Sequence, residues 1–243
     1  MNEMKRIIAI LLAVLSVTII LTACSNNEDT KTQSDKAASA AQAGDNSSAT
    51  QMNDNAPSGG KALVIYFNYS ENIDTTGLDV DTVTSASMRG GSTGKNVENL
   101  KVMVDEIKEL KNADVFSIRV NEVYPPDFED MTGIAKDDIA NNKQFTFKEE
   151  LTNLADYDTV YFGAPVWWGE LPQPVHVFFQ KYDFSGKTII PFGIHHGSAF
   201  GQMVDQMKEY EPNADILDGF TIDADTDNDK VKTEFDAFLG TVN

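Results

Sequence analysis

The sequence predicts one α/β domain in which helices cover both faces of a five-stranded parallel sheet. Two observations support this fold class. From residue 61 onwards, short segments rich in β-branched and aromatic residues alternate with segments of helical periodicity, and this alternation is typical of parallel sheets. The first strand, residues 61–67 (KALVIYF), is also a continuous apolar run, as expected of a strand that is buried on both faces.

The remaining elements follow in the same alternation. After a polar loop over residues 68–97, Leu100, Val104 and Ile107 form the apolar stripe of a helix. His176 is expected at the surface of a later helix. Periodicity predicts strands over 113–120, 157–165, 187–194 and 214–222, and helices over 97–110, 137–154 (in two pieces), 174–182, 200–210 and 228–239.

The first 60 residues predict an export signal followed by a tether. Lys5 and Arg6 precede an apolar run over residues 7–20, which is shorter than the ~20 residues that a membrane-spanning helix needs, and this arrangement is typical of a secretory signal. We therefore expect a signal peptide over residues 1–23. A flexible polar tether over 24–60 would follow, because that stretch has too few large apolar side chains to form a core. The folded domain would span residues 61–243.

The four residues LTAC, 21–24, resemble the lipobox of bacterial lipoproteins. The resemblance implies cleavage before Cys24, lipid on its sulfur, and an extracytoplasmic protein that is lipid-anchored to the bacterial cell membrane. A simple cleaved signal and an uncleaved anchor are the alternatives. Since Cys24 is the only cysteine of the chain, its lipidation would leave no thiol for a disulfide, a nucleophile or a zinc site.

The charge and the motifs argue against several classes of function. The formal net charge is −19, which argues against binding to nucleic acid or to anionic lipid head groups, because both require basic patches. The sequence has neither a Gly-x-Ser-x-Gly turn nor a cluster of metal ligands. We therefore expect no hydrolase site and no metal.

Three loops are candidates for a binding site. In parallel sheets of this kind, ligands bind beyond the carboxyl ends of the strands, where the strand order reverses. The loops at this edge are expected over residues 68–97, 166–172 and 195–200. The middle loop holds both tryptophans of the chain, Trp167 and Trp168, and so it is the first candidate for binding a flat aromatic ligand.

Three stretches carry a resemblance to a known family. They are DTVTSASM (81–88), YDTVYFGAPVWWGELPQPV (157–175) and YDFSGKTIIPFGIHHGSAFG (182–201). Together they resemble the flavodoxin-like family, in particular its short-chain bacterial flavoproteins, over nearly all of residues 61–243. The resemblance implies a three-layer sandwich with the strand order 2-1-3-4-5 and an FMN cofactor at the switch point.

The resemblance also implies that the loops after the third and fourth strands hold the flavin ring. Large aromatic side chains can stack on its face, and the alternative for each tryptophan is to cap the core. His196 stands where the family tends to have glycine, and its imidazole would either assist proton uptake by the flavin or simply be exposed. The expected ring contacts are Pro165, Val166, Trp167, Trp168, Gly169, His195, His196, Gly197 and Ser198.

The phosphate of FMN is expected at the start of the first helix, where backbone N–H groups and the helix dipole favour an anion. The family motif there ends in Gly-Asn-Thr, and two matches are open. A gapless match aligns it with residues 98–100 and keeps only Asn99, whereas a shifted match aligns it with residues 94–96. The shifted match is chemically preferable, because Glu98 would repel phosphate. The expected phosphate contacts are then Thr93, Gly94, Lys95 and Asn96, with Ser70 and Asn72 from the near side.

These features predict an FMN-binding protein of extracytoplasmic electron transfer, with a redox partner protein or a small acceptor. A carrier fits better than bond-making chemistry, because no catalytic acid, base or nucleophile stands out apart from His196. Two alternatives are open. One is an FMN-dependent NAD(P)H:quinone-type reductase, which shares the fold and the cofactor. The other is a flavin-free binding lipoprotein that retains the fold.

Overall fold

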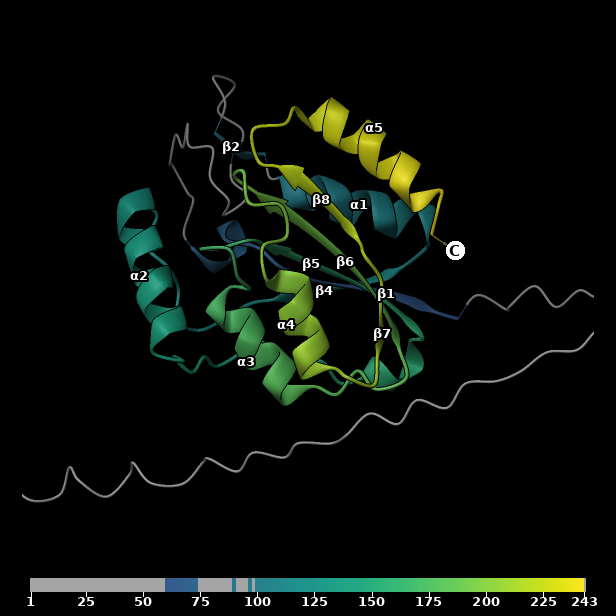
Figure 1. Ribbon diagram of the computed structural model, residues 1–243, viewed down its shortest axis with the longest axis horizontal. Helices are drawn as coiled ribbons and strands as arrows, with labels where there is room; N and C mark the ends of the chain where they lie inside the picture. Colours follow the sequence, from purple (N-terminus) through teal and green to yellow (C-terminus); the bar gives the residue numbers. More distant parts are fainter. Residues whose placement is uncertain (1–59, 74–88, 91–95, 98, 243) are drawn as a thin grey trace, which may run out of the picture. The chain divides into compact units, whose positions relative to one another are not determined.

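The computed structural model describes residues 60–73, 89–90, 96–97 and 99–242 (Figure 1). Its centre is a parallel sheet made of β1 (Ala62–Phe67), β4 (Asp114–Ile118), β5 (Thr159–Pro165), β6 (Thr188–His195), β7 (Asp215–Ile216) and β8 (Phe220–Asp223). β1 pairs with β4 on one side and with β5 on the other, and β6 follows β5. Both β7 and β8 pair with β6 and together form the fifth strand. Counted along the chain, the strand order is 2-1-3-4-5, as predicted.

The fifth strand is interrupted opposite Pro191 of β6. β7 pairs with Thr188 and Ile189, and the pairing of β8 begins at Phe192. Proline has no N–H to donate to a neighbouring strand. Its carbonyl oxygen faces the gap, only 2.2 Å from where a Cβ on Gly219 would lie, and Gly219 has a φ of 75°. The single fifth strand expected from the sequence is therefore two short ones.

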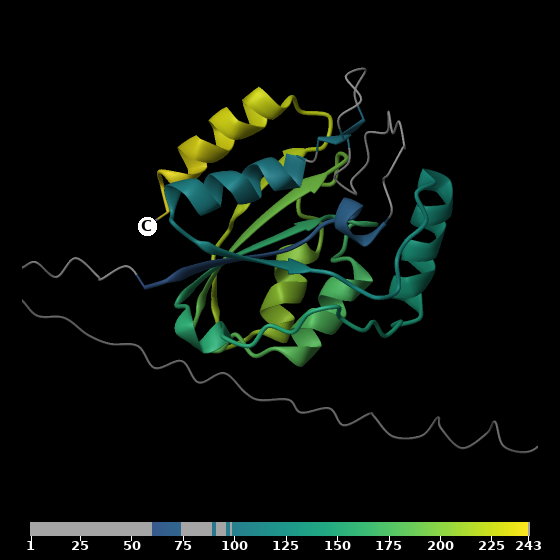
Figure 2. The same cartoon turned by 180° about the vertical axis from the view of Figure 1, so that it is seen from behind.

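Helices cover both faces of the sheet (Figures 1 and 2). One pair of helices lies on one face, a second pair lies on the other face, and a fifth helix stands at the flank. The first pair is α1 (Asn99–Leu110) and α5 (Asn228–Leu239), the second is α3 (Gln173–Lys181) and α4 (Met203–Tyr210), and the fifth is α2 (Phe128–Ala140). Within the described ranges, no helix has the length and apolar character needed to cross a membrane.

The first strand divides its side chains between two cores, one on each face. Val64 and Tyr66 are buried with residues of α1 and α5, whereas Leu63, Ile65 and Phe67 are buried with residues of α3 and α4. Successive side chains of a strand point to opposite faces of the sheet. The continuous apolar run of β1 is therefore explained by burial on both sides, as the sequence predicts.

The smaller elements lie mainly in the connections. They are the 3₁₀ turns η1 (Ser70–Asn72) and η2 (Leu154–Asp156) and the antiparallel pair of β2 (Arg89–Gly90) with β3 (Asn96–Val97). Of the larger elements, α5 has the predicted bounds, and α1, α3 and α4 begin within a few residues of theirs.

α2 differs from its prediction. The helix expected within residues 137–154 instead begins at residue 128, directly after Asp127, whose side chain accepts a hydrogen bond from the N–H of Asp130 at 3.0 Å. It ends at Ala140, before Asn142, whose φ of 49° is not helical. Beyond this point an antiparallel bridge joins Val120 to Phe147 at the end of β4. The apolar residues of this stretch cover the sheet edge and do not form a helical stripe.

Candidate functional site

The candidate site lies at the carboxyl ends of β1, β5 and β6. The chain passes from β1 outwards to β4 in one direction and from β5 outwards to β6 in the other, so the order reverses between β1 and β5. In sheets of this kind, ligands bind at such a reversal, between the loops that follow the strands. The loop after β5 contains both tryptophans.

The tryptophan loop makes a tight turn at Trp168 and Gly169. The backbones of Trp167 and Glu170 exchange hydrogen bonds of 3.0 and 2.9 Å, and Trp168 and Gly169 have φ values of 54° and 81°. Positive φ at both central residues defines the tight turn known as type I′. This conformation costs a non-glycine residue roughly 1–2 kcal/mol. Backbone strain at a bulky residue is common at functional sites, so Trp168 is a candidate for one.

The turn is braced by α4 and by the loop before it. The Gln206 side chain accepts a hydrogen bond from the N–H of Leu171 at 2.9 Å and donates one to the Glu170 carboxylate at 3.0 Å. The N–H of Gln202 donates to the carbonyl of Gly169 at 2.7 Å. The loops after β5 and β6 are therefore fixed to each other, and sequence reasoning missed Gln206 because nothing local in the sequence indicates this contact.

Trp167 caps the core. Only 3% of the residue is exposed, and its indole makes edge-on contacts with the rings of Phe67, Tyr69 and Tyr124 at centroid distances of 5.5, 6.3 and 5.2 Å. Its faces and edges are thus occupied by protein. Of the two alternatives open from the sequence, the structure gives Trp167 the core role.

Trp168 has the opposite environment. It is 55% exposed, and no aromatic ring of the described residues packs against it. Its Nε1–H donates to the carbonyl of Thr132 in α2 at 3.0 Å, and the Lys136 ammonium lies 4.9 Å from the indole centroid. Trp168 is therefore the aromatic side chain of this loop that is placed to receive a ligand.

The loop after β6 begins with a largely buried histidine. The side chain of His195 is 14% exposed, and its Nδ1 accepts a hydrogen bond from the N–H of Gly197 at 3.0 Å. The nearest Asp223 oxygen is 3.8 Å from the same nitrogen, too far for a hydrogen bond. Burial lowers the pKa of His195 and outweighs the opposing effect of Asp223. The ring is accordingly neutral at neutral pH, with its proton on Nε2.

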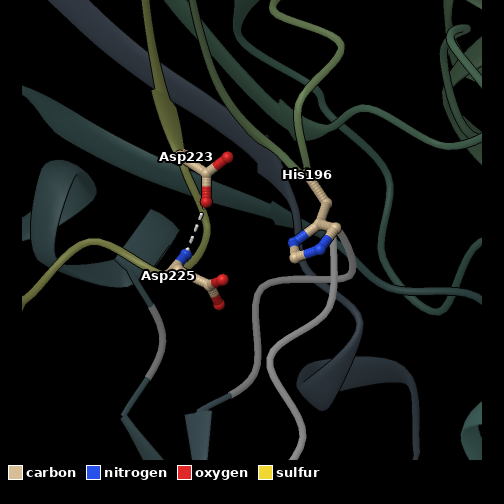
Figure 3. A group of neighbouring side chains, drawn as sticks. All are labelled: His196, Asp223 and Asp225. Carbon is tan, nitrogen blue, oxygen red and sulfur yellow. Dashed lines mark hydrogen bonds between the residues drawn. The ribbon is translucent and has the colours of Figure 1, made fainter.

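His196 faces two carboxylates across the rim. Figure 3 shows its imidazole turned towards Asp223 and Asp225, and one ligand atom from each of the three lies within 4.8 Å of the others. The N–H of Asp225 donates to Asp223 at 2.9 Å. One nitrogen and two oxygens are ligand types that a divalent cation accepts. His196 and Asp225 are exposed, as on an ordinary polar rim, and we assign no metal role to them.

The other predicted ring contacts lie around this edge. Pro165 ends β5, and Val166 is buried, with its N–H bonded to the carbonyl of Ile194 at 2.9 Å. Gly197 has a φ of 87°, and the exposed Ser198 donates its hydroxyl to the carbonyl of Ala199. The structure thus gathers the predicted residues of the second and third loops at one end of the sheet.

The loop after β1 has a structural role at Asn72. This side chain is fully buried, donates to the carbonyls of Asn68 and Ile118 at 2.7 and 3.3 Å, and accepts from the N–H of Val120 at 2.8 Å. Its donors are used within the protein, so the predicted phosphate contact of Asn72 is not what the structure supports. Ser70 is half-buried at the start of η1.

The start of α1 bears on the two phosphate matches. α1 begins at Asn99, whereas Asn96 belongs to β3 and pairs with Gly90. The helix start thus agrees with the gapless match, contrary to our preference for the shifted one, because Asn96 lies outside the first helical turn. Asn99 is buried and anchors the turn after β8 by donating to the carbonyls of Ala224 and Thr226 at 2.8 and 3.2 Å. Three predicted contacts, Thr93, Gly94 and Lys95, lie outside the described residues.

His176 is buried, contrary to expectation. It is 8% exposed between α3 and α4, with its Nδ1 3.0 Å from the Tyr210 hydroxyl. Burial lowers its pKa, more than the nearby Glu170 raises it. The residue lies in the first turn of α3, directly after the tryptophan loop, and interacts with Glu170 and Leu171 of that loop.

The fold and the position of the site define a class, the doubly wound α/β proteins of strand order 2-1-3-4-5. The model of the flavodoxin family matches residues 99–238, and the chain belongs to this family. No curated protein matches the chain significantly in sequence.

Solved structures of bacterial proteins are similar in fold. A protein of Bacteroides uniformis assigned as a flavoprotein has 22% identity and a TM-score of 0.53, over 73% of this chain and 99% of its own. A protein of Bacteroides eggerthii with the same assignment has 18% identity and a TM-score of 0.51, over 74% of this chain and 98% of its own. A flavoprotein of Lactobacillus acidophilus in complex with FMN has 19% identity and a TM-score of 0.46, over 70% of this chain and 97% of its own.

Proposed function

We propose that this protein binds FMN and transfers electrons outside the cytoplasm. Membership of the flavodoxin family supports the cofactor, because flavodoxin holds FMN at this switch point. The observation that carries the proposal is Trp168, an exposed indole held at positive φ where β5 ends. An exposed aromatic side chain at a strained backbone position suits stacking on a flat ring.

The residues present fit FMN, which would supply one- and two-electron transfer when bound. Trp168 would stack on one face of the ring, and the loop over 195–198 would flank it. The backbone N–H groups and the dipole at the N-terminus of α1 would favour the phosphate, against the charge of Glu98, which directly precedes the helix. His196 would lie at the edge of the ring, on the side of Asp223 and Asp225.

The test of cofactor binding is a titration of the purified full-length protein with FMN and, separately, with riboflavin. We expect quenching of the fluorescence of both ligands and tighter binding of FMN, because only FMN carries the phosphate. The absence of quenching at saturating protein would overturn the proposal. Consumption of NAD(P)H by the FMN-loaded protein in the presence of a quinone would instead identify a reductase.

A flavin-free binding lipoprotein is the second candidate, and Glu71 favours it. This carboxylate follows Ser70 directly and accepts hydrogen bonds from the hydroxyls of Tyr66 and Ser117. A negative charge at the end of β1 would repel a phosphate. Failure of both flavins to bind would support this candidate.

We also propose that export and lipidation at Cys24 anchor the domain to the cell membrane through the tether over 24–60. The support is the lipobox-like sequence LTAC at residues 21–24. Replacement of Cys24→Ser should release the protein from the membrane fraction and abolish labelling by a radioactive fatty acid. Membrane retention of the unlabelled variant would contradict the lipid anchor.

A further inference from the structure

α2 holds Trp168 by two contacts from one face. Thr132 and Lys136 are four residues apart, so they lie one above the other on the helix. Thr132 fixes the edge of the indole through its carbonyl, and Lys136 covers one ring face with its ammonium 4.9 Å from the centroid. On the other side, the carbonyl of Gly169 is fixed by Gln202. The orientation of the indole is therefore set from outside its own turn.

Lys136 carries the single positive charge of its helix. It is the only cationic residue in α2, whose sequence FEDMTGIAKDDIA contains four acidic residues, and the whole chain has a formal net charge of −19. A cation that lies over an indole is held there by the negative potential of the ring face. Lys136 thus places a positive charge beside the indole in a protein whose formal net charge is strongly negative.

We propose that Lys136 is a positioning residue for the flavin. It holds Trp168 in the orientation that stacks on the cofactor, and its charge behind the indole favours the more negative, reduced form of the ring. This inference rests on the proposed function, because it takes the flavin to stack on the face of Trp168 that Lys136 leaves free. It adds a residue from outside the three loops that the sequence predicted, and it gives a role at the site to α2, the helix whose bounds were mispredicted.

The first experiment needs no cofactor. Tryptophan emission of the full-length protein is quenched with neutral acrylamide and with anionic iodide, and Trp168 dominates the quenching because Trp167 is buried and out of reach of both quenchers. Lys136→Met should raise quenching by acrylamide and lower the ratio of iodide to acrylamide quenching, because both the cover and the positive charge are lost. Lys136→Arg should restore both, and the exposed Lys208→Met on α4 is the control for loss of one charge.

The second experiment measures FMN affinity and midpoint potential at low ionic strength. Lys136→Met should raise the Kd by roughly two- to fivefold, the factor expected for an exposed cation–π contact, and lower the potential, whereas Lys136→Arg and Lys208→Met should leave both near those of the unmodified protein. A Lys136→Met protein with unchanged quenching, Kd and potential would overturn the inference while the proposed function stands. If the unmodified protein binds no FMN, the proposed function fails, and the quenching experiment alone decides whether Lys136 holds Trp168.

Discussion

Trp167 and Trp168 are neighbours in the chain with opposite environments, and the turn between β5 and α3 is the reason. Trp167 is the last residue before the turn and its side chain lies in the core, whereas Trp168 is the first residue of the turn at positive φ. A change of φ to positive values redirects the side chain, so the second indole leaves the core. The sequence could mark this pair as exceptional but could not assign the roles, because the φ of a tryptophan is not encoded in local propensity.

The two tryptophans should therefore respond differently to replacement by alanine. Trp168→Ala should raise the Kd for FMN roughly three- to tenfold, as expected for one lost aromatic stack, with little loss of stability. Trp167→Ala should lower the free energy of unfolding by about 3–5 kcal/mol, as for a large aromatic side chain removed from a core.

FMN fluorescence titration and urea unfolding of both variants are the measurements. Trp167→Phe is a milder control, because it keeps an aromatic ring in contact with Phe67, Tyr69 and Tyr124. A Trp168→Ala protein that binds FMN as well as the unmodified protein would contradict stacking by this residue.

At the level of elements, the sequence predicted the buried strands well and α2 poorly. The central strands β1, β5 and β6 are buried on both faces, so their positions follow from their apolar composition. α2 lies at the flank, and most of its residues are exposed, so its sequence shows little periodicity. Its start depends on the cap at Asp127, and the apolar residues after it pack on β4 and gave a misleading helical pattern.

The connection after β1 depends on a single amide, which can be tested. Asn72→Ala would leave the buried N–H of Val120 without its acceptor. A buried group left unsatisfied costs about 1–3 kcal/mol, so urea unfolding should show a loss of that size. Ser70→Ala, a change at the half-buried neighbouring turn, is the control and should cost much less. Equal losses would show that the amide does not hold this loop.

For the whole molecule, the buried His176 and the largely buried His195 predict acid sensitivity. The pKa values of His176 and His195 are both lowered from 6.5, chiefly by burial. The unfolded chain therefore binds protons that the folded protein does not, and the stability present above pH 6.5 is lost as the pH falls through 6.5 towards the lowered values.

Urea unfolding at pH 7.5, 6.5 and 5.5 should show this decline. His176→Gln retains a partner for the Tyr210 hydroxyl but does not titrate, so it should make the decline shallower. The His176 explanation would be refuted by an equally steep decline in this variant.

The overall charge predicts how salt affects cofactor binding. At a formal net charge of −19, long-range repulsion opposes the approach of an FMN phosphate, and salt screens it as the Debye length falls from ~30 Å at 0.01 M to ~8 Å at 0.15 M. FMN should therefore bind more tightly at the higher ionic strength. Riboflavin, which lacks the phosphate, should change much less. Weaker FMN binding in salt would mean that local cations such as Lys136 outweigh the net charge.

The fold class followed from the sequence because alternating buried strands and amphipathic helices leave few arrangements, and the strand order followed from the resemblance to the flavodoxin-like family. The site was only partly predictable, because its supports come from distant elements. Gln206, Lys136 and Asp223 reach the loops from α4, α2 and β8, and such contacts leave no local pattern. The roles of Asn72 and His176 were missed for the same reason.

The interruption opposite Pro191 divides the edge strand of the sheet into two segments, β7 and β8, which can open independently of each other. β7 and β8 share no continuous ladder, because the pairing stops on either side of Pro191. A fluctuation that frees β8 therefore need not spread to β7. β8 ends at Asp223, which pairs with His195 at the start of the loop over 195–200. Local opening of β8 would therefore loosen this loop while β7 stayed paired with β6. Deuterium should accordingly replace the amide hydrogens of β8 sooner than those of β5, which is paired on both sides.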